Sequence, residues 1–430
     1  MSTPRRGHRS NSVCAGRQYR RILGRCGMLL LLISGVFTGC KPRDVVRDTP
    51  QMDADSEYWI RIRLYSGITS CLLHSPSPVT LQSQSPLDPS VSVDVSDARI
   101  DLKAGQLTVA NHTFVGKSLD VVSQRPYLIE LEGEPYRGSL RVIVSDDGTS
   151  FDVINRLPIE PYLAGVVGAE MPSYWEPEAL KAQAIVARTY CLYIKQRFGR
   201  QRDWDLSGTQ AHQVYKGVRG ESAQVWDAVQ ATQGQVLQTS TQDGRKELFP
   251  AYYSAVCGGH TEDSQHVFGG DSYPALKGVV CTYCRKVARP GQYFWPMAVF
   301  DKKTVSDRLI ARYPVLARLK TIKQIVPVRQ SLYDGFTRIT MVELVGSNGR
   351  TDRLRGEDLR LTIDPAGRKI RSMVCRLADW EDRWAFLSGR GWGHGVGLCQ
   401  CGAQWLARRG EQADQILQYY YPGSYLKKLY

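Results

Sequence analysis

Glu170 is the residue whose setting in the sequence most suggests acid–base chemistry. It lies at the carboxyl end of a predicted helix that begins after Pro158, and a Met-Pro corner follows it. The negative end of a helix dipole and partial burial both disfavour a carboxylate, so the pKa of this side chain should be raised. A carboxylic acid that stays protonated near neutral pH can act as the general acid in glycosidic cleavage. The alternative is a solvated glutamate without a catalytic role.

Three cysteines and a histidine are spaced as two chelating pairs. Cys257 and His260 flank two glycines, and Cys281 and Cys284 have two residues between them. Three thiolates and one imidazole would fill a tetrahedral zinc shell and leave no open position, which predicts a structural zinc site. His266 could replace His260 or support the ligands from a second shell. The alternative is a disulfide framework in an oxidising compartment, such as a Cys281–Cys284 bridge.

Two polar segments carry side chains suited to a saccharide. Gln213 and Tyr215 lie in the segment 208–217, and an amide and an aromatic ring match sugar hydroxyls and sugar faces. Either residue could equally be a turn residue or a packed ring. The second segment, a glycine-rich run near the C-terminus, contains Trp392 and His394 and leads to Gln400. Alternating glycines permit close backbone approach to a ligand.

The residues of the glycine-rich run also have structural alternatives. His394 is a candidate second polar group near a scissile bond, while Trp392 and Gln400 are candidate sugar contacts. A tight turn whose histidine only satisfies backbone groups would explain the same pattern. Cys399 and Cys401 flank Gln400, and their state stays open between free thiols and disulfides with other cysteines.

These segments together resemble the SpoIID/LytB family. Leu-Pro-x-Glu-x-Tyr-Leu starts at Leu157, and Glu-Met-Pro, Ala-Leu-Lys-Ala-Gln-Ala and Ala-Arg-Thr-Tyr follow it up to Tyr190. The segments at 208–217 and 388–403 resemble the family's Gln-Val-Tyr-x-Gly stretch and its glycine-rich C-terminal motif. The resemblance implies that the family's catalytic glutamate falls on Glu170, and that Arg188 and Tyr190 place the substrate or support the acid. The alternative for both is structural, with Arg188 as a buried ion-pair partner.

The resemblance implies a lytic transglycosylase of peptidoglycan. Such an enzyme cleaves between N-acetylmuramic acid and N-acetylglucosamine with one acidic residue and leaves 1,6-anhydromuramyl products. A hydrolase would need a second carboxylate, and no motif singles out Glu178, Glu262 or Asp263 for that role. The rival, which the LytB name suggests, is a non-catalytic wall-binding activator of an N-acetylmuramoyl-L-alanine amidase. The implied partners are peptidoglycan glycan strands and, as a second candidate, a cell-wall amidase or another wall-remodelling protein.

The first 40 residues have the layout of a bacterial lipoprotein signal peptide. Basic residues precede the apolar run Met28–Gly39, which is too short to span a bilayer, and Cys40 follows small residues. This pattern predicts a signal peptide with a lipobox at 1–40, lipidation of Cys40 and a tether at 41–56. The protein would then be exported and held at the membrane as a lipoprotein of the periplasmic face or cell envelope. The alternative is a buried N-terminal helix with a chance cysteine.

The charge balance adds little about partners. Lys and Arg number 56 against 42 Asp and Glu, a formal charge of +14, and such a surface attracts polyanions. Seven arginines of this excess precede the apolar run, where they belong to targeting. The sequence contains no RNP, KH or helix-turn-helix signature, so nucleic acid is not an expected partner.

The elements that must position these residues indicate an α+β fold. Short alternating runs predict a β-rich N-terminal lobe at 57–148, interrupted by an exposed loop at Ser75–Ser90, and a mixed SpoIID/LytB-like domain at 149–430. One amphipathic helix should begin after Pro158. A second should begin with the capping box Ser173-x-x-Glu176 and end at Gly199. Two short helices, at 400–409 and 412–421, should close the chain.

Overall fold

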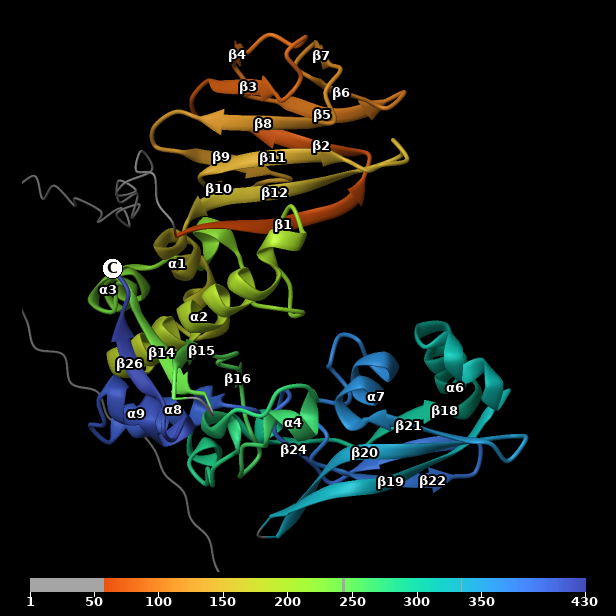
Figure 1. Ribbon diagram of the computed structural model, residues 1–430. Helices are drawn as coiled ribbons and strands as arrows, with labels where there is room; N and C mark the ends of the chain where they lie inside the picture. Colours follow the sequence, from red (N-terminus) through yellow and green to blue (C-terminus); the bar gives the residue numbers. More distant parts are fainter. Residues whose placement is uncertain (1–57, 242–243, 334) are drawn as a thin grey trace, which may run out of the picture. The chain divides into compact units, whose positions relative to one another are not determined.

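The computed structural model describes residues 58–241, 244–333 and 335–430, and the chain has an α+β fold (Figure 1). The predicted fold class is confirmed. The predicted signal peptide, the tether and Cys40 lie outside the described residues. No helix of the described residues is both long enough and apolar enough to cross a bilayer.

The first part of the described chain is β-rich, as predicted. Alternating side chains of its strands, such as Ile60, Ile62, Leu140 and Val142, are fully buried because one face of each strand meets the core. The strands are β1 (Trp59–Ile68), β2 (Ser70–His74), β3 (Val79–Ser83), β4 (Val91–Val93), β5 (Ala98–Lys103), β6 (Gln106–Val109), β7 (His112–Phe114), β8 (Ser118–Ser123), β9 (Leu128–Leu131), β10 (Glu134–Arg137), β11 (Ser139–Val144), β12 (Phe151–Pro158) and β13 (Leu206–Ser207). Within the described residues they form a seven-stranded sheet, β13-β1-β12-β11-β8-β3-β4, and a six-stranded sheet, β10-β9-β2-β5-β6-β7.

Two features of these sheets differ from the sequence prediction. The expected exposed loop at Ser75–Ser90 contains strand β3, which pairs with β8 and β4 and buries Val79 and Leu81 completely. The short apolar alternation of β3 is hidden among serines and prolines, which is why the sequence indicated a loop. The seven-stranded sheet also extends past residue 148, because β12 and β13 both pair with β1.

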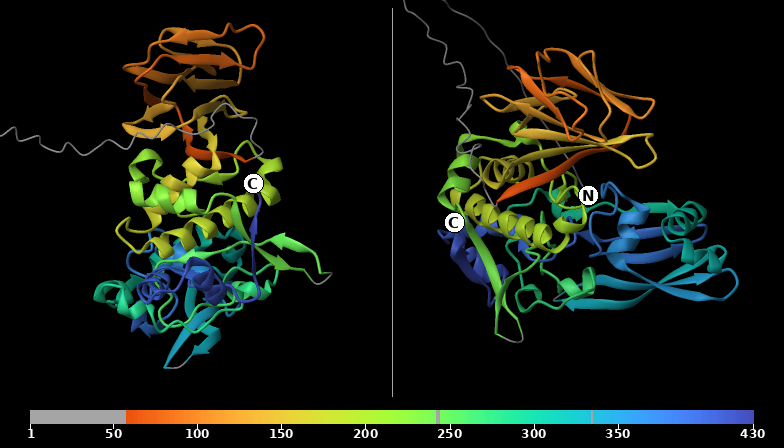
Figure 2. Two further views of the ribbon diagram at one scale, coloured as in Figure 1. Left: turned by 90° about the vertical axis from the view of Figure 1, so that its left-hand side faces the viewer. Right: turned by 45° about the horizontal axis from the view of Figure 1, so that its top comes forward.

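Two helices follow the first sheet and carry the motif that contains Glu170. Helix α1 (Ile159–Glu170) continues directly from β12, as Pro158 predicted. Helix α2 (Pro177–Phe198) lies beside β14 (Gln235–Ser240) in both views of Figure 2. The predicted capping box is wrong: the N-cap residue is Glu176, it makes no side-chain cap, and Pro177 at the first helical position sets the start.

Glycines bring α1 against the next loop. A Cβ on Gly165 would lie 2.5 Å from the Tyr215 ring, and a Cβ on Gly168 would lie 1.8 Å from the carbonyl oxygen of Gly220. Gly220 belongs to the 3₁₀ helix η2 (Gly217–Gly220). Only glycine fits at these close approaches, so they fix the loop before η2 beside the C-terminal end of α1.

The middle and end of the chain form small sheets and helices around α2. The predicted C-terminal helices are confirmed as α8 and α9. Strand β16 pairs in parallel with β25, with Ser254 opposite Cys399. The elements are η1 (Gly199–Gln201), α3 (Ala223–Ala231), β14, β15 (Lys246–Leu248), β16 (Tyr253–Ser254), α4 (Ser264–Val267), η3 (Pro274–Leu276), η4 (Cys284–Lys286), β25 (Leu398–Cys399), α8 (Gln400–Arg408), α9 (Ala413–Tyr420) and β26 (Tyr425–Lys428).

Residues 294–390 build a second hydrophobic core, and we call this segment the inserted lobe (teal to blue in Figure 1). Its core includes Val305, Leu309, Trp384 and Phe386, all nearly inaccessible. The elements here are α5 (Pro290–Tyr293), just before the lobe, and β17 (Phe294–Trp295), β18 (Ala298–Asp301), α6 (Lys302–Arg312), η5 (Pro314–Leu319), β19 (Ile322–Tyr333), β20 (Phe336–Gly346), β21 (Thr351–Arg355), α7 (Gly356–Ile363), β22 (Arg376–Trp380), β23 (Arg383–Leu387) and β24 (Gly389–Arg390). The region predicted as one domain at 149–430 therefore has two cores.

Candidate active site

Glu170 is the last residue of α1, and it is partly exposed. Its Oε1 accepts a hydrogen bond from the Val214 backbone N–H at 3.0 Å and one from the Tyr253 hydroxyl at 3.4 Å, and the Gln400 side chain also bonds to it. Burial raises the pKa of Glu170 above that of an ordinary glutamate, although these three hydrogen bonds partly lower it. The predicted direction of the shift is confirmed.

Two predicted saccharide contacts belong to the support of this carboxyl group. Gln213 is 1% exposed; its amide oxygen accepts from the Tyr162 hydroxyl at 3.0 Å, and its amide nitrogen donates to the Tyr253 hydroxyl at 3.2 Å. Gln400 is 4% exposed and donates to the Gln183 amide oxygen at 3.4 Å. The structure therefore does not present these two amides to a saccharide. They hold the groups that surround Glu170.

Tyr253 is the member of this site that sequence reasoning missed. It lies on β16, and its hydroxyl links Gln213 to Glu170. Burial and the neighbouring Glu170 keep its pKa well above the ordinary tyrosine value, so the hydroxyl is a proton donor. The only sequence signal was its place in the segment 251–261, four residues before Cys257, where Tyr252 is an equal candidate.

Three other predicted contacts are packed inside the protein. Arg188 is fully buried and donates to both carboxylate oxygens of Glu160, at 3.0 and 2.6 Å. The structure thus shows the buried ion pair that the sequence left as the alternative. Tyr190 packs on Tyr252, and the hydroxyl of the buried Tyr215 donates to Asn155 at 3.0 Å. For all three side chains the structure shows the packed alternative, because the helix and loop that carry them turn them into the core.

His394 is satisfied by backbone groups. Its Nδ1 accepts a hydrogen bond from the Val396 N–H at 3.0 Å, and the imidazole also bonds to the backbone of Tyr253. Burial lowers the pKa of His394 to about 4, so the ring is neutral at physiological pH. This is the turn-stabilising alternative. The partly exposed Trp392 carries the Arg371 guanidinium over its ring, 4.6 Å from the centroid.

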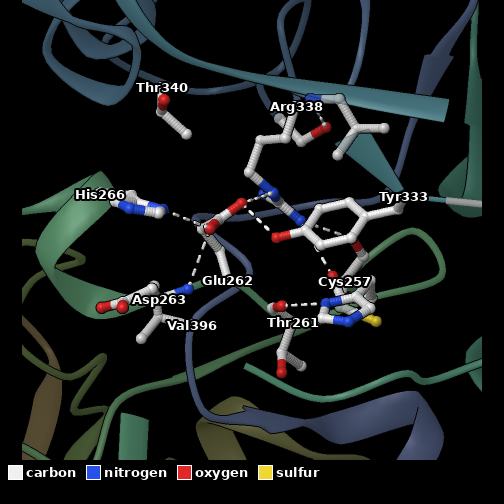
Figure 3. A network of polar contacts seen from close by, with 12 residues as sticks. Cys257, Thr261, Glu262, Asp263, His266, Tyr333, Arg338, Thr340 and Val396 are labelled. Carbon is white, nitrogen blue, oxygen red and sulfur yellow. Dashed lines mark hydrogen bonds and ion pairs between the residues drawn. The ribbon is translucent and has the colours of Figure 1, made fainter. Parts of the chain in front are cut away.

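A second glutamate, Glu262, lies in a buried polar network (Figure 3). Its carboxylate is 3.7 Å from Arg338 Nε, accepts from the Tyr333 hydroxyl, and lies 3.0 Å from His266 Nδ1. Arg338 comes from β20 of the inserted lobe and also donates to the carbonyl oxygens of Cys257 and His394, at 2.8 and 2.9 Å. This network fastens the inserted lobe to the glycine-rich run.

The other candidate second carboxylates also have structural partners. Glu178 pairs with Lys181 and accepts from the Ala413 N–H at the start of α9. Asp263 caps α4 and pairs with Lys277 at 2.9 Å. These contacts engage both side chains in holding helices together.

Four buried thiols gather where the sequence predicted a zinc site. The four sulfur atoms all lie within 4.8 Å of one another, and we call them the four-cysteine cluster: Cys257, Cys281, Cys284 and Cys399. Cys257, Cys281 and Cys284 lie together as their spacing predicted, but the fourth member of the group is Cys399 and not the predicted His260. Its ring stacks on Tyr333 at 3.9 Å, and its Nδ1 contacts the carbonyl oxygen of Thr261. All eight described cysteines are free thiols, so the Cys281–Cys284 bridge is not formed.

Comparison with known proteins gives a match over the Glu170 region. The family model described as stage II sporulation protein, SpoIID, matches residues 147–238. An uncharacterized protein of Brachyspira hyodysenteriae is 32% identical over 332 residues, which cover 77% of this chain and 81% of the relative. Stage II sporulation protein D of Bacillus subtilis is 27% identical, covering 65% of this chain and 77% of its own. The amidase enhancer of Bacillus subtilis is 25% identical, covering 76% of this chain and 49% of its own.

Proposed function

This chain belongs to the SpoIID/LytB family and has a cell-wall-related role, and from that premise we propose that it is a lytic transglycosylase of peptidoglycan. It cleaves the bond between N-acetylmuramic acid and N-acetylglucosamine in glycan strands. Glu170 is the general acid and then the general base, and the products end in 1,6-anhydromuramyl groups.

The observation that carries this proposal is the environment of Glu170. The carboxyl group is partly exposed at the C-terminal end of α1, and burial raises its pKa. Its three hydrogen-bond donors are neutral: a backbone N–H, a phenol and an amide. Neutral donors orient a carboxyl group without the strong stabilisation of the anion that a cation would give. Such a group can hold a proton at rest and release it to a ligand.

The proposed reaction uses this one group twice. Protonated Glu170 first gives its proton to the glycosidic oxygen, and the bond from that oxygen to the muramyl anomeric carbon breaks. The substrate's own acetamido group stabilises the positive charge that develops on the anomeric carbon. Ionised Glu170 then takes the proton of the muramyl C6 hydroxyl, whose oxygen bonds to the anomeric carbon. The ring closes, no water is consumed, and Glu170 ends protonated as it began.

The state of the other carboxylates supports a one-acid mechanism over hydrolysis. A hydrolase needs a second carboxylate roughly 5–10 Å from the first to act as nucleophile or base. Glu178, Glu262 and Asp263 are each engaged by cations and backbone groups. Ring closure by the substrate's own hydroxyl removes the need for such a group.

The leader sequence supports a location at the cell envelope. We propose that Cys40 is lipidated after cleavage of residues 1–39 and that residues 41–56 tether the folded part to the membrane. Mass spectrometry of the mature protein from the envelope fraction would test this, since a diacylated Cys40 should be its first residue.

The substitution Glu170→Gln tests the catalytic role. The amide keeps the shape of the side chain but cannot donate a proton as an acid, so we expect release of anhydromuramyl products from purified sacculi to fall by at least about a hundredfold. The matched control is Glu247→Gln on β15, an exposed glutamate that should leave release unchanged. Muropeptide mass spectrometry measures both. Undiminished release by Glu170→Gln would rule out the acid role.

The second candidate, suggested by the relative named amidase enhancer, is a non-catalytic activator of an N-acetylmuramoyl-L-alanine amidase. The same variants separate the two functions. If wild type releases no anhydromuramyl ends, yet wild type and Glu170→Gln equally accelerate a purified amidase on sacculi, the activator is the better description.

A further inference from the structure

We infer that the four-cysteine cluster is a closed zinc centre whose role is to hold the strand pair β16–β25 in place beside Glu170. The zinc site does not depend on the proposed function. Its role in positioning Glu170 does rest on the proposal that Glu170 is the catalytic acid.

The sulfur geometry fits one tetrahedral ion. With Zn–S bonds of about 2.3 Å, the edges of a regular tetrahedron are about 3.8 Å. The Cys257 and Cys284 sulfurs lie 3.7 Å apart, and all four lie within 4.8 Å of one another. Disulfide bonding would instead bring two sulfurs to about 2.05 Å. Four thiolates complete the shell of zinc and leave no position for water, so the centre is structural and not catalytic.

Neighbouring donors point at the sulfur atoms as they do around bound metals. The Cys257 backbone N–H donates to the Cys399 sulfur at 3.3 Å, and the Tyr420 hydroxyl lies 3.1 Å from the Cys281 sulfur. Donors of this kind stabilise metal thiolates. A Cβ on Gly402 would lie 1.9 Å from the Tyr420 hydroxyl and 2.7 Å from the Cys281 sulfur, so glycine at this position makes room for the arrangement.

The cluster joins segments that are far apart in the sequence and adjacent at the site. Cys257 follows β16, whose Tyr253 donates to Glu170, and Cys399 is the last residue of β25. The next residue, Gln400, begins α8 and bonds to Glu170. Two of the three donors to Glu170 therefore lie within four residues of a cluster cysteine. A metal that fixes the cluster also fixes the register of β16 against β25, and with it both donors.

Metal analysis of the purified protein tests the centre without reference to activity. We expect about one zinc per chain by elemental mass spectrometry, and a tetrahedral thiolate spectrum when cobalt replaces zinc in the wild-type protein. Cys399→Ala should lose the zinc and lower the thermal transition by about 5 °C or more. The matched control Cys401→Ala, a buried thiol outside the cluster, and His260→Ala should both keep zinc. Disulfides among the four cysteines, iron in place of zinc, or loss of zinc in His260→Ala would overturn the inference.

The positioning role has its own readout. Chelator-treated protein that stays folded should cleave soluble glycan strands at least about tenfold more slowly at saturation and still bind them with unchanged affinity. Equal cleavage with and without zinc would remove the positioning role and leave the metal centre. If the zinc-loaded wild type does not cleave glycan at all, the proposed function fails while the metal result stands. The cobalt spectrum of the wild type tests the four-thiolate metal centre even if Cys399→Ala does not fold.

Discussion

Glu170 and Glu262 are both held by a tyrosine hydroxyl, yet their surroundings are opposite. Glu170 is partly exposed, and its donors are neutral. Glu262 is 2% exposed and faces the guanidinium of Arg338, which is equally buried. Burial with neutral donors favours a carboxyl group that keeps a proton, while burial against a cation favours a fixed anion.

The difference separates a group suited to chemistry from a group suited to structure. A buried ion pair resists change because the loss of one partner leaves the other charge without compensation. A partly exposed acid with a raised pKa can change its charge during a reaction at a small cost in free energy. Substitutions around Glu262 should therefore change stability, and substitutions around Glu170 should change activity.

The largest expected effect is a loss of stability when the buried ion pair of Glu262 and Arg338 is broken. Arg338→Met would leave Glu262 buried without its cation and remove donors from two carbonyl oxygens, so we expect a loss of about 3–5 kcal/mol in the free energy of unfolding. Denaturant titration measures it. Arg353→Met, which breaks an exposed pair with Glu343, is the control and should cost no more than about 1 kcal/mol. Equal effects of the two substitutions would contradict the structural role of Arg338.

Smaller effects are expected when the hydroxyl of Tyr333 or that of Tyr253 is removed, and the two effects should differ in kind. Tyr333→Phe deletes a hydrogen bond to a buried charge, and we expect a loss of about 1.5–3 kcal/mol in stability with no change in the pH profile of cleavage. Tyr253→Phe should cost only about 0.5–1.5 kcal/mol in stability, since its partners are neutral at rest. Its main effect should be on the pH dependence of activity.

The sign of that pH effect follows from the hydrogen bond. Activity requires protonated Glu170, so it falls as pH rises through the pKa of Glu170. The Tyr253 hydroxyl stabilises the ionised form and lowers this pKa, while burial raises it. Tyr253→Phe should therefore move the falling limb of the rate profile to higher pH. A shift to lower pH, or the same shift in Tyr333→Phe, would contradict the assignment.

Local patterns predicted the part of the site that lies on one helix. Pro158 and the spacing of apolar residues gave the start of α1, and the partial burial expected beside the Met-Pro corner gave the direction of the pKa shift of Glu170. Spacing also gave three members of the four-cysteine cluster. Its fourth member, Cys399, comes from a segment more than a hundred residues later, so no short-range rule could select it over His260.

The sequence did not predict which way the side chains of the site point. Arg188, Gln213 and Tyr215 are polar residues in family motifs, and each is turned into the core by the packing of α2 and the loop before η2. The Glu262–Arg338 pair depends on β20 of the inserted lobe reaching the glycine-rich run. Such contacts are set by tertiary packing, which neither periodicity nor spacing records.

Digestion of glycan strands in water enriched in ¹⁸O tests the central claim most directly, because it reports which oxygen closes the reaction. If Glu170 passes its proton to the glycosidic oxygen and then takes one from the muramyl C6 hydroxyl, every new muramyl end is a 1,6-anhydro sugar without ¹⁸O, as mass spectrometry would show. Reducing muramyl ends that carry ¹⁸O would mean that water attacks and that the protein is a hydrolase, in contradiction to the one-acid mechanism proposed for Glu170.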